Sequence, residues 1–401
     1  MNIKSSENKL ILLNSISYLS DGILVASIPL IASQIFTEEF APSTLMFAFS
    51  IPATLSLFSG CLADSSCPKK IIIVSNVIRS LVSLFVAALI YIQSANLLIF
   101  SFLFFILGSC EIFYENTLAT IPPKLISSEK LKYFNSKTEF ILNLLQLIVG
   151  RLTGSLLTII SLHLSFLVNF SLYFISSFFC SFRLNNHVDT IKTDKDQIKS
   201  SNILGSLKWY LTTQNLPVMS LVSCLNNVLI AGLISTLPVL MKLKFDSEVL
   251  VYGFSLTSFG VGFITGSSAH FFLKDLKTFR GLLVSEVIIM LGMFSLMFDF
   301  NPTSVVVTFF FFGLSISNWN ILSKTFRQIN VPIEIFGKVT SAHRTIAWLG
   351  NSLGPSSSGI IIALFGTDSV LYFFSSISTL SVLLCLFLFY KEKESENPLK
   401  I

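Results

Sequence analysis

Charged residues are scarce in this chain. Asp, Glu, Lys and Arg make up 12% of its 401 residues, whereas hydrophobic residues make up 52%. A water-soluble protein has about a quarter of its residues charged, so this composition excludes an ordinary soluble domain. The net charge is only +5, and the distribution of Lys and Arg described below accounts for it, so it does not indicate binding to nucleic acid.

Motifs for metals, cofactors and catalysis are also missing. The six cysteines are scattered singly, which predicts neither a disulfide framework nor a zinc site. No glycine-rich phosphate loop and no stretch long enough for a soluble ATPase domain occur, so ATP-driven pumping by this chain is excluded. The four histidines are isolated and no nucleophile motif is present. We therefore expect no enzyme activity, no cofactor and no metal site.

Long apolar runs dominate the remaining sequence. A membrane's hydrocarbon core requires about 20 apolar residues of helix, and twelve runs meet this length. They are Leu10–Phe36, Pro42–Ala63, Ile71–Ile92, Leu97–Leu118, Thr138–Ile160, Leu164–Phe182, Pro217–Leu240, Leu250–Leu273, Gly281–Phe300, Ser304–Leu322, Val339–Phe365 and Val370–Phe389. The first run contains Asp21 and lacks a small-residue cleavage site, so we expect a retained helix rather than a signal peptide.

The positions of Lys and Arg predict the orientation. Alternate loops, together with both termini, hold 22 of the 27 basic residues, the opposite loops hold only Lys242 and Lys244, and three arginines lie within runs. Basic loops stay on the cytoplasmic side during insertion. The pattern therefore predicts a multi-pass protein of the bacterial cytoplasmic (inner) membrane with both termini in the cytoplasm.

The chain is divided into two halves by one polar stretch. We predict an N-terminal six-helix bundle over 1–183, a cytoplasmic linker over 184–214 and a C-terminal six-helix bundle over 215–401. Three similarities relate the halves at offsets of 204 to 210: Val74–Ile78 with Val284–Ile288, Gly108 with Gly313, and Gly150 with Gly354. Such offsets are typical of transporter folds built from repeats.

Seven charged residues lie deep inside the apolar runs, where charges are costly and usually functional or paired. They are Asp21, Arg79, Glu111, Glu115, Arg151, Glu286 and Arg344. Counting along the helices places Asp21 and Glu111 near mid-membrane and Arg151 slightly beyond. Glu111 and Arg151 are expected to face each other, either as a structural ion pair or as a substrate or proton site. Arg79, Glu286 and Arg344 are expected nearer the cytoplasmic surface.

The loop after the second run carries a recognisable motif. Gly60–Lys70 resembles the loop motif of the major facilitator superfamily, a Gly, then Asp-Arg, then a basic pair. The resemblance implies that Asp64, Lys69 and Lys70 close a cytoplasmic gate, with the carboxylate against a helix N-terminus. Ser65 replaces the usual Arg, which implies a weaker latch.

Further motifs resemble the branch of macrolide-efflux and enterobactin-exporter-like proteins. They are Leu107–Asn116, Pro122-Pro123, Leu131–Asn135, Asn318–Asn320, Phe326–Gln328, Val331-Pro332 and Gly337–Val339 followed by Arg344. The antiporter signature Gly-Pro-x-x-Gly-Gly reads Gly150–Ser155 here, with Arg151 in place of proline. Without proline the expected helix bend is lost, proton antiport is in question, and Arg151 suggests an anionic or carbonyl-rich substrate.

Residues and resemblance together predict an all-α integral membrane protein with twelve transmembrane helices in two pseudo-symmetric six-helix bundles. We expect a monomeric secondary transporter, a proton-coupled efflux antiporter for an amphipathic small molecule such as an antibiotic or siderophore. The alternatives are an importer of a nutrient or iron chelate and a non-transporting membrane sensor. The predicted substrate or proton residues are Asp21, Glu111, Glu115, Arg151 and Asn318, and the predicted gate residues are Gly60, Asp64, Lys69, Lys70, Arg79, Glu286, Arg327 and Arg344.

Overall fold

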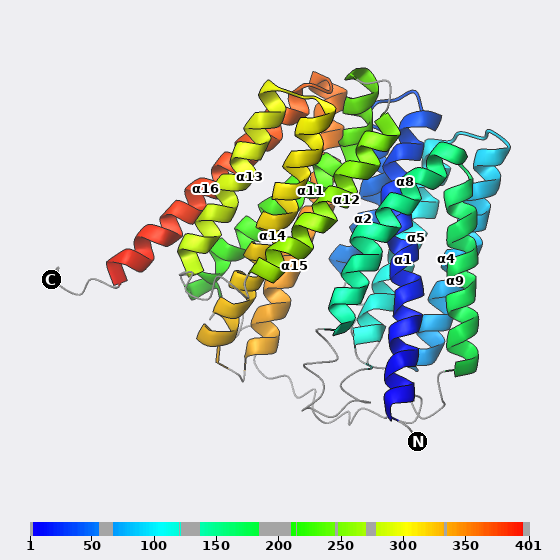
Figure 1. Ribbon diagram of the computed structural model, residues 1–401, viewed down its shortest axis with the longest axis horizontal. Helices are drawn as coiled ribbons and strands as arrows, with labels where there is room; N and C mark the ends of the chain where they lie inside the picture. The colour runs from blue at the N-terminus through cyan, green and yellow to red at the C-terminus, as the bar shows by residue number, and fades with distance from the viewer. Residues whose placement is uncertain are drawn as a thin grey trace. The chain divides into compact units, whose positions relative to one another are not determined.

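The computed structural model is helical throughout the part of the chain that it describes (Figure 1). The described residues are 3–55, 67–119, 121, 137–183, 210–213, 215–244, 248–269, 278–332 and 335–395. Within these ranges no strand occurs.

The first half contributes six helical segments. They are α1 (Ile3–Ile35), α2 (Ala41–Ser50) with the following 3₁₀ turn η1 (Ile51–Leu55), α4 (Pro68–Tyr91), α5 (Leu97–Ala119), a helix that begins at Lys137 and continues through η2 (Leu144–Gly150) and α8 (Arg151–Ile160), and α9 (Leu164–Arg183). The second half contributes α11 (Leu216–Lys244), α12 (Glu248–Ala269), α13 (Thr278–Phe298), α14 (Pro302–Asn330), α15 (Phe336–Phe365) and α16 (Ser369–Ser395). The all-α membrane fold with twelve helical segments that the sequence predicts is thus confirmed.

Ten of these described segments are long and apolar enough, by length and composition, to cross a membrane. Of the other two, α2 with η1 covers only residues 41–55 of the described chain. Helix α15 is 30 residues long, but it carries His343, Arg344 and several serines, which lower its hydropathy. A helix with so many polar groups must turn them towards other helices or water rather than lipid.

Local sequence explains where several helices begin and end. Asn301 caps α14, because its side chain accepts from the Ser304 backbone while the Ser304 hydroxyl accepts from the Asn301 backbone. Pro302 follows at the first helical position, where a missing N–H costs nothing. Gly366, with φ of 81°, follows the last turn of α15, and this positive φ, which glycine adopts without strain, ends the helix there.

The fifth helix departs from α geometry without a proline. Residues Leu144–Gly150 form π-helical turns that lead directly into α8 at Arg151. Here Gly150 meets α1 so closely that an added Cβ would lie 2.8 Å from the Leu19 carbonyl oxygen. The sequence led us to expect a regular helix at this point because the proline of the signature is absent. The helix instead contains π-helical turns where it packs on α1. Such turns make a helix irregular even where it has no proline.

Close helix contacts repeat in the two halves. A Cβ at Gly108 of α5 would lie 1.9 Å from the Phe49 carbonyl oxygen of α2, and a Cβ at Gly313 of α14 would lie 1.9 Å from the Phe259 carbonyl oxygen of α12. Only glycine allows backbones this near. The two glycines are the pair related by an offset of 205 in the sequence, so the repeat extends to the packing of equivalent helices.

The described chain forms two compact units. One comprises Met1–Gln197 with Ser235–Thr257, and the other comprises Ile198–Ile234 with Ser258–Ile401. Large apolar side chains are exposed in both, among them Leu98 at 81% in the first unit and Phe298 at 81% in the second. A soluble protein rarely exposes so much apolar surface, whereas a lipid bilayer covers it.

Candidate transport site

A buried ion pair organises the polar interior of the first unit. The Arg79 guanidinium of α4 contacts the Asp21 carboxylate of α1, and both side chains are 0% exposed. The Tyr173 hydroxyl of α9 donates to Asp21 Oδ1 at 2.7 Å and lies 2.9 Å from Arg79 Nη2. Charges buried to this degree require paired and hydrogen-bonded partners. Three helices are therefore joined at one point by a charged network.

Neutral polar groups extend this network. Arg79 Nη1 donates to Asn76 Oδ1 at 3.3 Å, and Asn76 Nδ2 donates to the Ser176 hydroxyl at 3.0 Å. The guanidinium also lies over the Tyr173 ring, 4.0 Å from its centroid, and 5.4 Å from the centroid of Tyr114. Such cation–π contacts stabilise a desolvated cation.

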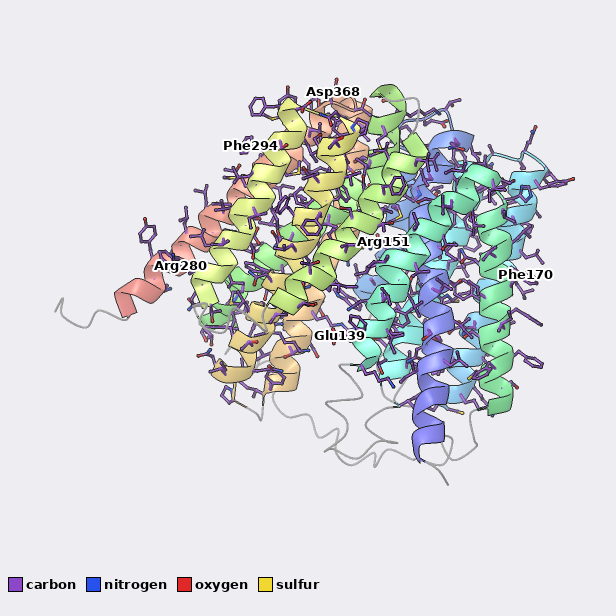
Figure 2. The ribbon with its side chains drawn as sticks, viewed as in Figure 1. Glu139, Arg151, Phe170, Arg280, Phe294 and Asp368 are labelled. Atoms are coloured by element: carbon purple, nitrogen blue, oxygen red, sulfur yellow. The ribbon has the colours of Figure 1, made fainter. Side chains whose placement is uncertain are left out.

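One carboxylate of α5, Glu111, lies near the same arginine. Glu111 interacts electrostatically with Glu115 and with Arg79, and both glutamates are half-buried. Arg151, labelled in Figure 2 at the start of α8, is 9% exposed and interacts electrostatically with Tyr252. Glu111 is thus under the electrostatic influence of Arg79, and its pairing with Arg151 stays a prediction.

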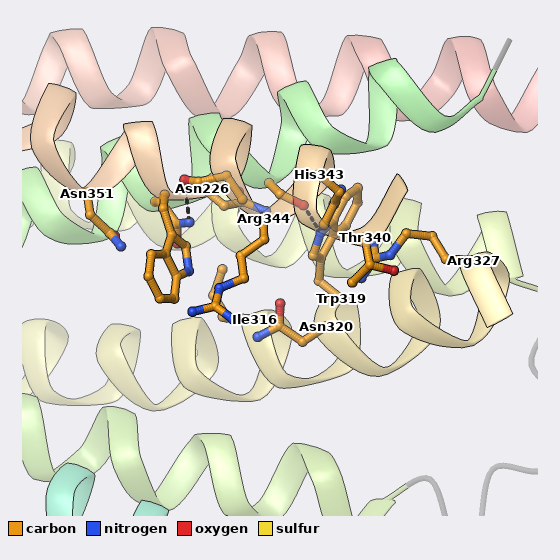
Figure 3. A pocket seen from close by; sticks show the side chains of 13 residues that line it. Asn226, Ile316, Trp319, Asn320, Arg327, Thr340, His343, Arg344 and Asn351 are labelled. Carbon is orange, nitrogen blue, oxygen red and sulfur yellow. Dashed lines mark hydrogen bonds between the residues drawn. The ribbon is translucent and has the colours of Figure 1, made fainter. Parts of the chain in front are cut away.

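A polar cavity of about 290 Å³ lies within the second unit (Figure 3). Three helices line it, each with residues spaced by three or four positions, which places them on one helical face. Helix α11 contributes Ser223, Asn226 and Asn227, helix α14 contributes Ile316, Trp319, Asn320 and Arg327, and helix α15 contributes Thr340, His343, Arg344, Ala347, Trp348 and Asn351.

The lining combines cations, amides and aromatic rings. Arg344 lies over the Trp348 ring, 4.1 Å from its centroid, and Figure 3 shows its side chain reaching from α15 towards α14. Arg327 Nη1 donates to Ser323 at 2.6 Å, and the Trp319 indole N–H donates to Ser223 at 2.8 Å. Among the described residues, those that line the cavity include two arginines and no carboxylate. Its electrostatic character therefore favours an anionic or acceptor-rich group.

One end of the cavity is supported by a chain of hydroxyl and imidazole groups. The Tyr210 hydroxyl donates to the Ser220 hydroxyl, which in turn lies 2.6 Å from His343 Nδ1. Burial raises the pKa of Tyr210 above its usual value of 10, although the Ser220 hydrogen bond and the nearby Arg327 act in the opposite direction. Tyr210 consequently remains a hydrogen-bond donor at neutral pH.

A buried carboxyl group lies directly behind the cavity. Glu286 of α13 is 0% exposed, and its Oε1 accepts a hydrogen bond of 2.7 Å from Asn226 Nδ2. Its second oxygen, Oε2, has no hydrogen-bond partner in the described structure. The preceding residue of α13, Ser285, accepts a 2.6 Å hydrogen bond from Asn318 of α14. Asn226 is thus shared between the cavity lining and the carboxyl group.

Comparison with known proteins identifies the fold. The sequence matches the family model described as Major Facilitator Superfamily over residues 10–346. The chain belongs to this superfamily. No curated protein sequence matches this superfamily member.

Solved structures of transporters resemble this superfamily member along its whole length. One is the nucleoside transporter NupG, with a TM-score of 0.76 and 13% identity over 97% of this chain and 99% of that chain. Another is a bacterial homologue of the human lysosomal transporter Spinster in an inward-facing and occupied conformation, with a TM-score of 0.73 and 13% identity over 97% of this chain and 96% of that chain. At this identity the similarity shows the fold.

The site residues that we predict from the sequence lie in both units. Asp21 contacts Arg79, Glu111 interacts electrostatically with Arg79 and with Glu115, and Arg151 lies near Tyr252. Asn318 donates to Ser285 and to the Gly281 carbonyl oxygen. Of the predicted gate residues, Lys69 and Lys70 lie in the first turn of α4, Arg327 and Arg344 line the cavity, and Glu286 lies behind it. Gly60 and Asp64 lie outside the described residues.

Sequence reasoning missed most of the cavity. Asn226, Asn227, His343, Trp348 and Asn351 were not singled out, although all five line it. A signal for them was present in the spacing along α15, whose lining residues are three or four positions apart from residue 340 to residue 351. Neutral polar residues at this period in a membrane helix mark a face that avoids lipid.

Proposed function

We propose that this protein is a secondary active transporter for an amphipathic small molecule with an anionic or carbonyl-rich polar group. The observation that carries the proposal is the cavity of about 290 Å³ in the second unit, lined by Arg327, Arg344 and four asparagines. Ligand sites usually combine a concave surface with a few converging polar groups. The superfamily fold supports alternating access around such a site.

Each kind of lining residue has a defined task in this proposal. Arg344 binds the anionic or carbonyl group of the solute, because a guanidinium offers several donors in one plane. Trp348, which lies 4.1 Å from that guanidinium, offers a flat apolar surface to the ring or hydrocarbon part of the same molecule. The asparagine amides supply both donors and acceptors, which suits a solute with mixed polar groups.

Export in exchange for protons is the direction that the motif resemblance implies. The motifs in question are Leu107–Asn116 and Asn318–Asn320, which resemble efflux proteins. Import together with a proton is the second candidate. One observation favours it: the Glu286 carboxyl lies behind the cavity without a cation partner among the described residues, so a proton bound there makes the cavity more attractive to an anion.

Transport into and out of proteoliposomes tests the proposal. The purified protein is reconstituted, and a panel of amphipathic carboxylates, lactones and catechol chelates is screened with a pH gradient of either sign. We expect accumulation of at least one anionic or carbonyl-rich compound that depends on the gradient. Arg344→Gln should weaken its binding about tenfold to a hundredfold, since hydrogen bonds to charged groups contribute about 1.5–3 kcal/mol.

Arg280→Gln is the matched control, because Arg280 is exposed at the start of α13. The sign of the gradient that drives accumulation distinguishes export from import, and cells that lack the protein retain more compound in the first case and take up less in the second. If no compound in the panel moves and the double change Glu111→Gln with Arg151→Met leaves the cellular phenotype intact, the protein is a membrane sensor and the proposal fails.

A further inference from the structure

The Glu286 carboxyl group is not exposed in the cavity, but a single hydrogen bond connects it to a residue that lines the cavity. Glu286 is 0% exposed, and Asn226 both donates to Glu286 Oε1 at 2.7 Å and lines the cavity. Glu286 Oε2 has no partner in the described structure. A buried carboxylate normally has a cation or several donors for its two oxygens, so this arrangement requires an explanation.

We infer that Glu286 binds one proton reversibly and that Asn226 links this protonation to ligand binding in the cavity. The proposal rests on the proposed function in its second form, import together with a proton, and names the group that couples the proton to the solute. The proton comes from water on one side of the membrane, bonds to Oε2, and returns to water when the carboxylate forms again. No other bond is made or broken.

The chemistry of the two protonation states gives the linkage its sign. An ionised carboxylate accepts a charge-assisted hydrogen bond, which is stronger than the bond that a neutral acid accepts. Ionised Glu286 therefore holds the Asn226 amide away from the cavity, whereas neutral Glu286 leaves its N–H groups available to an acceptor on the solute. The negative charge on ionised Glu286 also opposes an anion in the cavity. Both effects favour binding of the anion together with the proton.

Other titratable groups near Glu286 are few in the described structure. From α16, Cys385 interacts electrostatically with Glu286, and α11 contributes the neutral Asn226. Beyond Asn226, the titratable or charged residues that line the cavity are His343 and Arg344 of α15 and Arg327 of α14. His343 is the other cavity group that titrates near neutral pH in ordinary surroundings, so the experiment must separate its effect from that of Glu286.

Binding of benzenesulfonate tests the linkage, because this probe stays anionic across the range used. The protein is held in nanodiscs in a Trp209→Phe background, so that Trp319 and Trp348 report binding by their emission, and titrations are made at pH 5 and pH 8. We expect binding to be about tenfold tighter at pH 5. Glu286→Gln, which keeps the acceptor for Asn226 but carries no charge, should bind equally well at both values.

Three controls accompany these variants. Glu139→Gln, the same change at an exposed carboxylate (Figure 2), should keep the full pH dependence, and so should His343→Gln. Benzenesulfonamide, a neutral analogue, should show a smaller difference between the two pH values. Equal binding of benzenesulfonate by the wild-type protein at both values, or an undiminished difference in Glu286→Gln, would overturn the inference.

A second measurement needs no ligand. Infrared difference spectra between the two pH values should contain the C=O stretch of one protonated carboxylic acid, accompanied by a change in tryptophan emission. Glu286→Gln should lose both signals, and Asn226→Leu should keep the infrared band but lose the emission change. If benzenesulfonate never binds, the proposed anion site is wrong, but the infrared measurement still tests the protonation of Glu286. An infrared band that persists in Glu286→Gln would refute the inference.

Discussion

At the scale of single residues, the Asp21–Arg79 pair is the group most sensitive to change. Removing one partner leaves a buried charge without compensation, which costs about 3–5 kcal/mol. We expect Arg79→Met to lower the thermal unfolding midpoint in detergent strongly, and the double variant Asp21→Leu with Arg79→Met to lose less than the sum of the single changes. Lys70→Met, at an exposed position of the same helix, is the control and should have little effect. Additive losses would mean that the two side chains do not interact.

The buried hydroxyl of Tyr210 should make the stability of the protein depend on pH in the alkaline range. This hydroxyl donates to Ser220, and burial raises its pKa above the usual value of 10. A group with a raised folded-state pKa contributes its stability fully below the unfolded pKa and loses it as the pH rises through the folded pKa. We expect Tyr210→Phe to be less stable than the wild type by about 1 kcal/mol at pH 7.

This difference should shrink above pH 10, when the wild-type tyrosine begins to ionise. Thermal unfolding of both proteins between pH 7 and pH 11 measures it. A constant difference over that range would show that burial does not raise the pKa of the Tyr210 hydroxyl in the folded protein.

At the scale of helices, backbone contacts at glycine hold neighbouring elements together. A Cβ at Gly313 would lie 1.9 Å from the Phe259 carbonyl oxygen, so Gly313→Ala must separate α14 from α12. We expect a loss of about 1–3 kcal/mol, the usual cost of overpacking, measured as a lower unfolding midpoint. At Gly292 the atoms nearest to a Cβ belong to the Phe312 and Thr308 side chains, which can move. Gly292→Ala should therefore cost less, and an equal or larger loss would contradict this interpretation.

The polar face of α15 predicts a pattern of chemical accessibility. Asn351 lines the cavity, whereas Leu353, two residues away, is 51% exposed on the apolar surface. In a cysteine-free background, Asn351→Cys should react with a water-soluble maleimide, because the thiolate forms in a hydrated cavity. Leu353→Cys should remain unmodified in the membrane. Equal reactivity at both positions would show that this face of α15 does not border water.

Helices could be predicted from the sequence, but their partners could not. Each apolar run is a local property, so hydropathy alone located the twelve segments. The pairing of Asp21 with Arg79 joins residues 58 positions apart, and it depends on which faces of α1 and α4 meet. Counting residues along α13 predicts how deep Glu286 lies in the membrane, but it cannot show that Asn226 of α11 is its partner.

At the scale of the whole molecule, the two halves place polar residues at equivalent positions for different purposes. Asn76 and Glu286 correspond at an offset of 210 in the repeat. Asn76 binds Ser176 and accepts from Arg79, which completes a neutralised network. Glu286 has one amide partner and a cavity beyond it. The two halves share close helix contacts at equivalent glycines, but the difference at these two positions leaves the first half with a closed charge pair and the second with an incompletely satisfied carboxyl group.

Membrane topology is the prediction that tests the whole arrangement. With 22 basic residues on one side and only Lys242 and Lys244 on the other, insertion should leave both termini in the cytoplasm. Epitope tags at either terminus should be accessible to antibody only after the membrane is permeabilised. A tag inserted at Ser94, in the turn between α4 and α5, should be accessible in intact cells. Because an even number of crossings returns the chain to its starting side, termini on opposite faces would mean that one of the twelve helices does not span.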